Sequence, residues 1–198
     1  MITGDTIYAE STPRGRGGIS ITRISGDNTR KILQEITIRD QWVAHLQCFT
    51  RIVNRDAEIV DEVMVVLHPG PHSYTGEDLA EISSHGNPVI VDQIMETIHE
   101  TRLARPALGG EFTKKAFLNS RIDLAQAEAV DSMISAKSAT GLDMARGLLS
   151  GEVSTLVYGL SRDIRDIMER IEASFVSEDV EVAPGEIAGA IGDIIQCM

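Results

Sequence analysis

The feature that most constrains the fold is a change in the spacing of apolar residues near Ser120-Arg121. Before this point, short apolar runs alternate with turns that contain Gly and Pro, which is typical of strands interleaved with helices. After it, apolar residues recur every three or four positions, as on one face of a helix. The sequence therefore predicts a mixed α/β (α+β) domain over residues 1–119, followed by an incomplete all-α bundle over residues 120–198.

Five strands are expected in the first part, at residues 6–10, 19–24, 48–53, 58–68 and 79–84. The apolar run Val63–Leu67 is continuous, which is typical of a strand buried on both faces. Two helices are expected between the strands, the first capped by Asp27 and the second by Asn87, with Pro88 in its first turn. A loop at residues 102–110 then leads to a short helix at residues 111–119.

The second part carries almost no turn signal from Asp123 to residue 150, which predicts an uninterrupted helix there. Ser150-Gly151 marks its end. A further helix is predicted from the apolar positions Val153, Leu156, Val157, Leu160, Ile164, Ile167, Met168, Ile171 and Phe175. Another helix begins near Pro184, and its apolar face continues to the last residues without a capping signal, which suggests a truncated protein.

Composition narrows the function classes. The net charge of −12 predicts a poor general binder of nucleic acid, because an acidic chain repels the phosphate backbone. The two cysteines, Cys48 and Cys197, have no CxxC spacing, which favours a reduced cytoplasmic protein without disulfides or a thiolate zinc site. No stretch reaches the ~18 apolar residues of a membrane span, so we expect no membrane association.

Two segments resemble ligand sites, one for phosphate and one for zinc, but the sequence favours a structural role for both. The Gly-rich stretch Thr12–Gly18 is followed by a strand rather than a helix, and GxxxxGK[ST] is absent, which favours a turn with positive φ over a phosphate site. His68 and His72 have zinc-ligand spacing, with His85 further on. Because two prolines separate His68 from His72 and no third ligand is suitably spaced, we predict no metal site. No residue is predicted to be catalytic.

Three charged residues remain open to more than one interpretation. Glu81 lies in an apolar strand, and Arg23 stands between Ile21 and Ile24 in another. Burying one unpaired carboxylate is costly, so Glu81 either faces outward, pairs with Arg23, or joins Arg23 in a pocket for a polar ligand. Arg121 follows the end of the mixed domain, where a solvated surface residue is the simpler interpretation.

Three ordered motifs carry a family resemblance. They are TPRGRGGISITRISG at residues 12–26, PGPHSYTGEDLAEISSHG at 69–86, and GEFTKKAFLNSRIDLAQAEAVDSMISA at 110–136. Together they resemble the MnmE (TrmE) family of tRNA-modification GTPases, whose signatures include TPxGxGGIxIxRISG and PGEFTxRAFLNGKxDLxQAEA. The resemblance extends over residues 6 to about 175.

The resemblance implies a tetrahydrofolate-binding first domain, similar to the folate domain of the glycine-cleavage aminomethyltransferase. It also implies a homodimer that works with an FAD-dependent MnmG-type partner on C5 of the wobble uridine in tRNA. The one-carbon donor would be 5-formyl- or 5,10-methylene-tetrahydrofolate. The family's folate contacts correspond to Arg23, Glu81 and Arg121 of this sequence.

The sequence departs from the family pattern at residues 106–111, Asn87 and Ser120, and the surroundings of Cys197 do not match the family's C-terminal motif. GTP hydrolysis, with its potassium and magnesium, would belong to a GTPase domain that these residues do not contain. The alternative to a folate-binding module is a truncated relative that only dimerises or binds the partner protein.

Overall fold

The computed structural model describes residues 5–176. The described residues divide into two compact units, one ending at Ile122 and the other beginning at Asp123. The helix predicted near Pro184 lies outside the described residues. Among the described helices, none is both long enough and apolar enough to cross a membrane.

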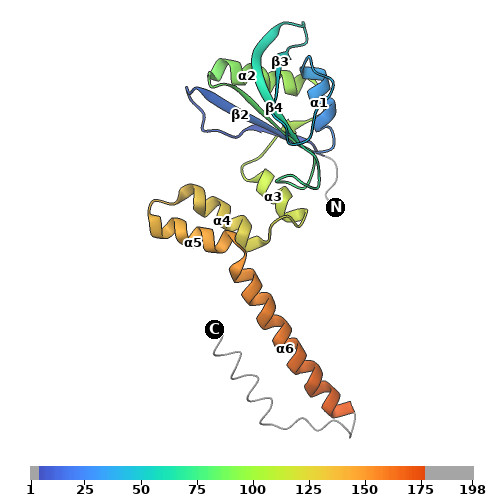
Figure 1. Cartoon of the computed structure of the whole chain (residues 1–198), viewed down its shortest axis with the longest axis vertical. Helices are drawn as coiled ribbons and strands as arrows, with labels where there is room; N and C mark the ends of the chain where they lie inside the picture. The colour runs from blue at the N-terminus through green and yellow to red at the C-terminus, as the bar shows by residue number, and fades with distance from the viewer. Residues whose placement is uncertain (1–4, 177–198) are drawn as a thin grey trace. The chain divides into compact units, whose positions relative to one another are not determined.

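The first unit is built on a six-stranded sheet with the strand order β3-β4-β5-β2-β1-β6 (Figure 1). The strands are β1 (Ile7–Glu10), β2 (Ile19–Ser25), β3 (Cys48–Val53), β4 (Ile59–His68), β5 (Leu79–His85) and β6 (Arg105–Pro106). Neighbouring strands are antiparallel except β1 and β6, which run parallel. The mixed α/β character and the five predicted strands are confirmed. The sequence missed β6, a two-residue strand inside the predicted loop.

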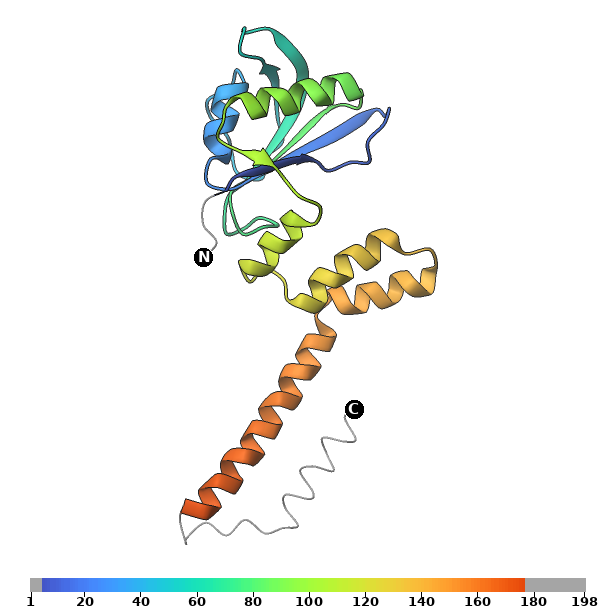
Figure 2. The ribbon, with the colours of Figure 1, turned by 180° about the vertical axis from the view of Figure 1, so that it is seen from behind.

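Two helices, α1 (Thr29–Ile36) and α2 (Pro88–Glu100), pack on one face of the sheet, where Figure 2 shows α2 crossing the strands. Val63, Val65 and Leu67 of β4 are buried on that face, whereas Met64 and Val66 are only half-buried. The prediction of a strand buried on both faces is therefore wrong. Apolar residues at every position are not needed in an antiparallel sheet with helices on one side.

The predicted cap of α2 is confirmed, and that of α1 is wrong. Asn87 Oδ1 accepts the backbone N–H of Val89 at 3.0 Å. The N-cap of α1 is Asn28 rather than Asp27, and its side chain makes no capping bond. Asn28 Nδ2 donates instead to the Leu103 carbonyl, at 3.1 Å. Tertiary contacts therefore set where α1 begins.

The second unit contains α4 (Leu124–Ser135), α5 (Ala139–Leu149) and α6 (Glu152–Val176). The uninterrupted helix predicted from Asp123 to residue 150 is wrong, because the chain breaks at residues 136–138 and α4 and α5 pack side by side (Figure 2). Ser138 starts α5 by accepting the N–H of Gly141 at 3.1 Å. The predicted break at Ser150-Gly151 is confirmed, with φ of 80° at Gly151.

Candidate functional site

Arg23 and Glu81 face each other across β2 and β5, where the strand register pairs them directly. Both lie on the face opposite α2, because their neighbours Ile24 and Ile82 are buried beneath that helix. Arg23 Nε and Nη2 both donate to Glu81 Oε1, at 3.0 and 2.6 Å. Their side chains are 27% and 30% exposed, so water still reaches the pair.

Two aromatic rings flank the Arg23 guanidinium. Its Cζ lies 5.8 Å from the centroid of the Tyr74 ring and 5.7 Å from that of Phe112. Phe112 comes from α3 (Glu111–Leu118), and the Tyr74 hydroxyl is 2.9 Å from Thr113 Oγ1 on the same helix. Both distances are within cation–π range, so the rings restrict the guanidinium and leave it fewer positions beside Glu81.

Arg121 reaches the same place from the end of the first unit. Its Nε donates to the Ser73 carbonyl at 3.2 Å. A cavity of about 440 Å³ lies there, lined by His68, His72, Ser73, Tyr74, Leu79, Glu81 and Arg121. This volume falls within the roughly 300–1,000 Å³ typical of small-molecule sites. The structure thus gathers all three predicted residues, with Glu81 and Arg121 in the wall and Arg23 held beside Glu81.

The cavity offers both a hydrogen-bond acceptor and hydrogen-bond donors. In the described part of the chain, Glu81 Oε2 has no hydrogen-bond donor and the two terminal nitrogens of Arg121 have no acceptor. A free carboxylate oxygen accepts N–H groups, whereas a guanidinium donates to carbonyl or carboxylate oxygens. This arrangement suits binding of a polar ligand.

Sequence reasoning missed the remaining lining residues and Phe112. All of them except His68 belong to two motifs recognised in the sequence, PGPHSYTGEDLAEISSHG and GEFTKKAFLNS. The aromatic residues inside those motifs, Tyr74 and Phe112, are the signal that was available.

His68 and His72 both line this cavity, whereas His85 is not among its lining residues. His68 Nδ1 lies 3.0 Å from Nδ1 of His45, whereas His85 Nδ1 is 2.7 Å from the Asp61 carboxylate. Across the described residues, no group of three or more His, Cys, Asp or Glu is placed to hold a metal ion.

The Gly-rich stretch forms the long loop of the β1–β2 hairpin between Glu10 and Ile19, rather than the tight β-turn that was predicted. The expected positive φ occurs at Gly15. The Gly17 N–H donates to the Gly86 carbonyl at 2.8 Å. A Cβ on Gly86 would come within 2.6 Å of the Gly17 carbonyl oxygen, so this close approach requires glycine.

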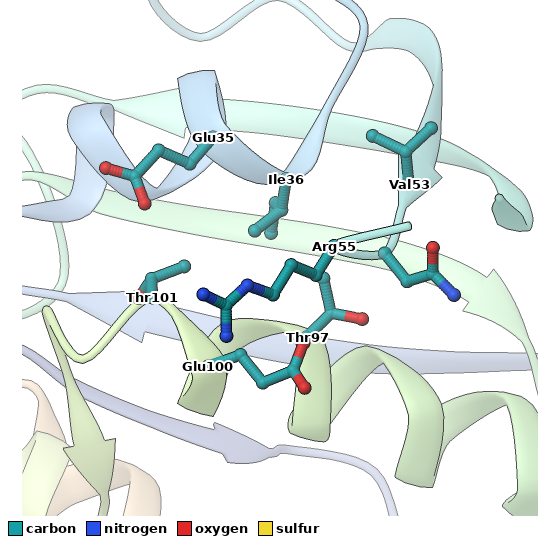
Figure 3. Close-up of a pocket in the computed structure, with 8 residues that line it drawn as sticks. Glu35, Ile36, Val53, Arg55, Thr97, Glu100 and Thr101 are labelled. Carbon is teal, nitrogen blue, oxygen red and sulfur yellow. The ribbon is translucent and has the colours of Figure 1, made fainter. Parts of the chain in front are cut away.

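A second cavity, of about 280 Å³, lies on the helix side of the sheet. Figure 3 shows the Arg55 side chain reaching across it between Glu35 and Glu100, which come from α1 and α2. None of the residues predicted as ligand contacts lines this cavity. Its lining holds one cation and two carboxylates, so the charge balance is negative and disfavours an anionic ligand.

The first unit is thus a mixed α/β domain with a cavity that has charged residues in its wall. The family described as "GTP-binding protein TrmE N-terminus" matches residues 6–121, which cover the sheet, α3 and Arg121. The chain therefore belongs to this family, and the resemblance identified from the motifs is confirmed.

Relatives named "tRNA modification GTPase MnmE" match over most of the chain. The relative from Roseiflexus sp. is 38% identical over 201 residues, which cover 100% of this chain and 43% of the relative. The relative from Lactiplantibacillus plantarum is 43% identical over 177 residues, which cover 86% of this chain and 37% of the relative. The relative from Vibrio cholerae is 35% identical over 200 residues, which cover 98% of this chain and 43% of the relative. The chain thus spans less than half the length of these relatives.

Proposed function

We propose that this chain is the folate-binding and dimer-forming N-terminal part of a tRNA-modifying GTPase that acts on C5 of the wobble uridine. The names of the relatives support the role in tRNA modification. The division into a folate domain at residues 1–119 and the start of a helical domain at residues 120–198 is part of this proposal, as is cytoplasmic location. GTP, potassium and magnesium would act through a GTPase domain outside these residues.

The observation that carries folate binding is the free Oε2 of Glu81 in the wall of the cavity. A pterin ring presents neighbouring N–H and NH₂ donors, which a carboxylate oxygen accepts. The mixed α/β domain is also compatible with the expected likeness to the folate domain of the glycine-cleavage aminomethyltransferase. The ligand would be 5-formyl- or 5,10-methylene-tetrahydrofolate, which supplies a one-carbon unit when bound.

Arg121 and Arg23 have different roles in this proposal. Arg121 directs its free terminal nitrogens to an oxygen of the ligand, because Ser73 occupies only its Nε. Arg23 does not line the cavity and instead holds Glu81 through Oε1. The carboxylate therefore has an ion-pair partner before any ligand arrives, so binding does not depend on relief of an unpaired buried charge.

Calorimetric titration of 5-formyltetrahydrofolate tests this proposal. Glu81→Gln places an NH₂ group where an acceptor is needed, and binding should weaken by at least ~tenfold, about 1.4 kcal/mol. Arg121→Ala should cost less, because the residue is exposed and water screens its pairing. Arg23→Ala should weaken binding through loss of the contact that orients Glu81.

Glu62→Gln is the matched control. Glu62 accepts two bonds from Arg51 through one oxygen, at 3.0 and 2.9 Å, in the geometry of the Glu81 pair but outside the cavity lining. It should leave folate affinity unchanged. A wild-type chain that is folded and dimeric yet gives no heat of binding would remove the folate proposal and favour the dimerisation or partner-binding module.

The proposed partners are a second copy of this chain, an FAD-dependent MnmG-type protein, and tRNA through the assembled complex. A net charge of −12 argues against direct tRNA binding by this chain alone, because it repels phosphates. Sedimentation equilibrium at micromolar concentration should show a dimer, whereas a monomer across the whole range would contradict dimer formation.

A further inference from the structure

Helix α3 forms one side of the cavity region although little of it is buried. Among its described residues, Ala116 is the only buried one, and Phe117 and Leu118 remain exposed. A helix of eight residues does not persist alone in water, because too few hydrogen bonds offset the cost of nucleation. Apolar burial is thus a weak anchor for α3, and polar contacts must hold it against the sheet domain.

One of these contacts joins Glu111 of α3 to Arg105 of β6, at 3.0 and 2.6 Å, and another joins α3 to Glu77. Lys115 Nζ donates to both oxygens of the Glu77 carboxylate, each at 2.8 Å, and to the backbone carbonyl of Asp5 at 2.9 Å. The same carboxylate accepts the Ser25 hydroxyl at 3.0 Å. The Lys115 and Glu77 side chains are only 12% and 19% exposed. Removing one partner would leave the other charge shielded from water and uncompensated, which is costly.

Three further contacts tie the loop of residues 73–77 to α3 and to the residues just after it. They are Tyr74–Thr113 at 2.9 Å, Asn119 Nδ2–Thr75 O at 2.7 Å and Arg121 Nε–Ser73 O at 3.2 Å. The loop runs close to this segment, since a Cβ on Gly76 would lie 3.1 Å from the side chains of both Asn119 and Arg121. Loop and helix therefore form one wall.

This wall determines the shape of the cavity. The loop contributes Ser73 and Tyr74 to its lining, and α3 places Phe112 against the guanidinium that holds Glu81. Loss of α3 from its position would release both rings and the Arg121 contact together. Lys115 itself does not line the cavity.

We propose that Lys115 is a positioning residue, which holds α3 and the loop of residues 73–77 together as the wall of the cavity. Ligand affinity then depends on a side chain that does not line the cavity. The identity of the ligand rests on the proposed function, whereas the structural coupling between α3 and the loop does not.

Lys115→Met tests the proposal, because it keeps much of the aliphatic stem and removes the charge. Amide hydrogen exchange in residues 73–77 and in α3 should become at least about tenfold faster, while β4 keeps its protection. Affinity for 5-formyltetrahydrofolate should fall by at least about tenfold, since a charge-assisted contact holding the wall is lost. Lys115→Arg should restore both, because a guanidinium also donates to a carboxylate.

Lys114→Met is the matched control, one residue away on the same helix and exposed to solvent. It should leave exchange and affinity as in the wild type. Asn119→Ala is a milder variant that removes only the contact with Thr75. It should change the exchange rates and the affinity in the same direction as Lys115→Met but by less, and it replaces Lys115→Met as the test if that variant fails to fold.

If residues 73–77 exchange at the same rate in Lys115→Met as in the wild type, the proposal is wrong. Faster exchange with unchanged affinity would also overturn it, as would equal effects of Lys114→Met and Lys115→Met. If the wild type binds no folate, the folate proposal fails by itself, and the exchange rates still decide whether Lys115 holds the wall.

Discussion

Helices α2 and α6 both carry apolar residues every three or four positions, but the two apolar faces differ in what they contact. Val91, Ile94, Thr97 and Ile98 of α2 are buried against the first unit. The apolar residues of α6 remain exposed in large part, among them Leu156, Val157, Tyr158, Ile164 and Met168. A period of three to four residues identifies a helix and its apolar face, but it does not say whether another element covers that face.

The same contrast separates the two units. The first unit has a continuous core of buried residues from the sheet, α1 and α2. In the second, α4 and α5 each bury a single residue among those described, Ala129 and Ala145. Since stability follows buried apolar area, we expect the described fold of the first unit to be the more stable of the two.

The sharpest test compares one substitution in two helices. Ile94→Ala removes a fully buried side chain from α2 and should cost roughly 2–5 kcal/mol of the free energy of unfolding. Ile164→Ala removes a side chain of a residue that is 49% exposed in α6, and should cost less than about 1 kcal/mol. Urea denaturation followed by circular dichroism measures both. Equal losses would mean that the α6 face is covered in solution.

Acidification should weaken the first unit through Glu111. Hydrogen bonds from Arg105 and from the backbone N–H of Leu108 lower the pKa of Glu111 from 4.5 to about 2. A lowered pKa stabilises the fold above pH 4.5, and this contribution is lost as the pH falls toward 2. With Arg105 43% exposed, we expect a contribution of only about 1 kcal/mol after screening by solvent.

Arg105→Met should remove most of that dependence. Urea midpoints of wild type and variant should be compared between about pH 6 and about pH 3, the range in which Glu111 of the unfolded chain, with its ordinary pKa of 4.5, takes up a proton. The two midpoints should converge as the pH falls. Parallel curves would show that the Arg105 contact contributes nothing to stability.

The smallest and most local effect is expected at the start of the second unit. Asp123 caps α4 by accepting the N–H of Gln126 at 2.9 Å. Gln126 Nε2 donates to the Leu149 carbonyl of α5, also at 2.9 Å. Hydrogen bonds from Ser154 and from the Gln126 N–H lower the pKa of Asp123. Asp123→Ala should speed exchange in the first turn of α4 and leave β4 unchanged. Altered exchange in β4 would show that the two units are coupled.

The candidate site was predictable as a set of residues and not as an arrangement. The motifs pointed to Arg23, Glu81 and Arg121, but spacing alone left Arg23 and Glu81 as surface residues, a simple pair, or walls of a pocket. The register between β2 and β5 decides that they pair, and the lining of the cavity shows that Glu81 also faces it. Lys115 and Lys114 are adjacent and chemically identical, and only their contacts distinguish them.

The sequence by itself determined the features that depend on neighbours along the chain. Turn residues and the Asn87 cap marked element ends, period-two and period-three-to-four patterns separated strands from helices, and the motifs identified the family. It failed where distant contacts decide, at β6 and at the start of α1, and it overlooked a local signal, the Ser138 cap, at the break between α4 and α5. Strand partners, covered faces and the wall held by Lys115 required the tertiary structure, because they depend on residues that only folding brings together.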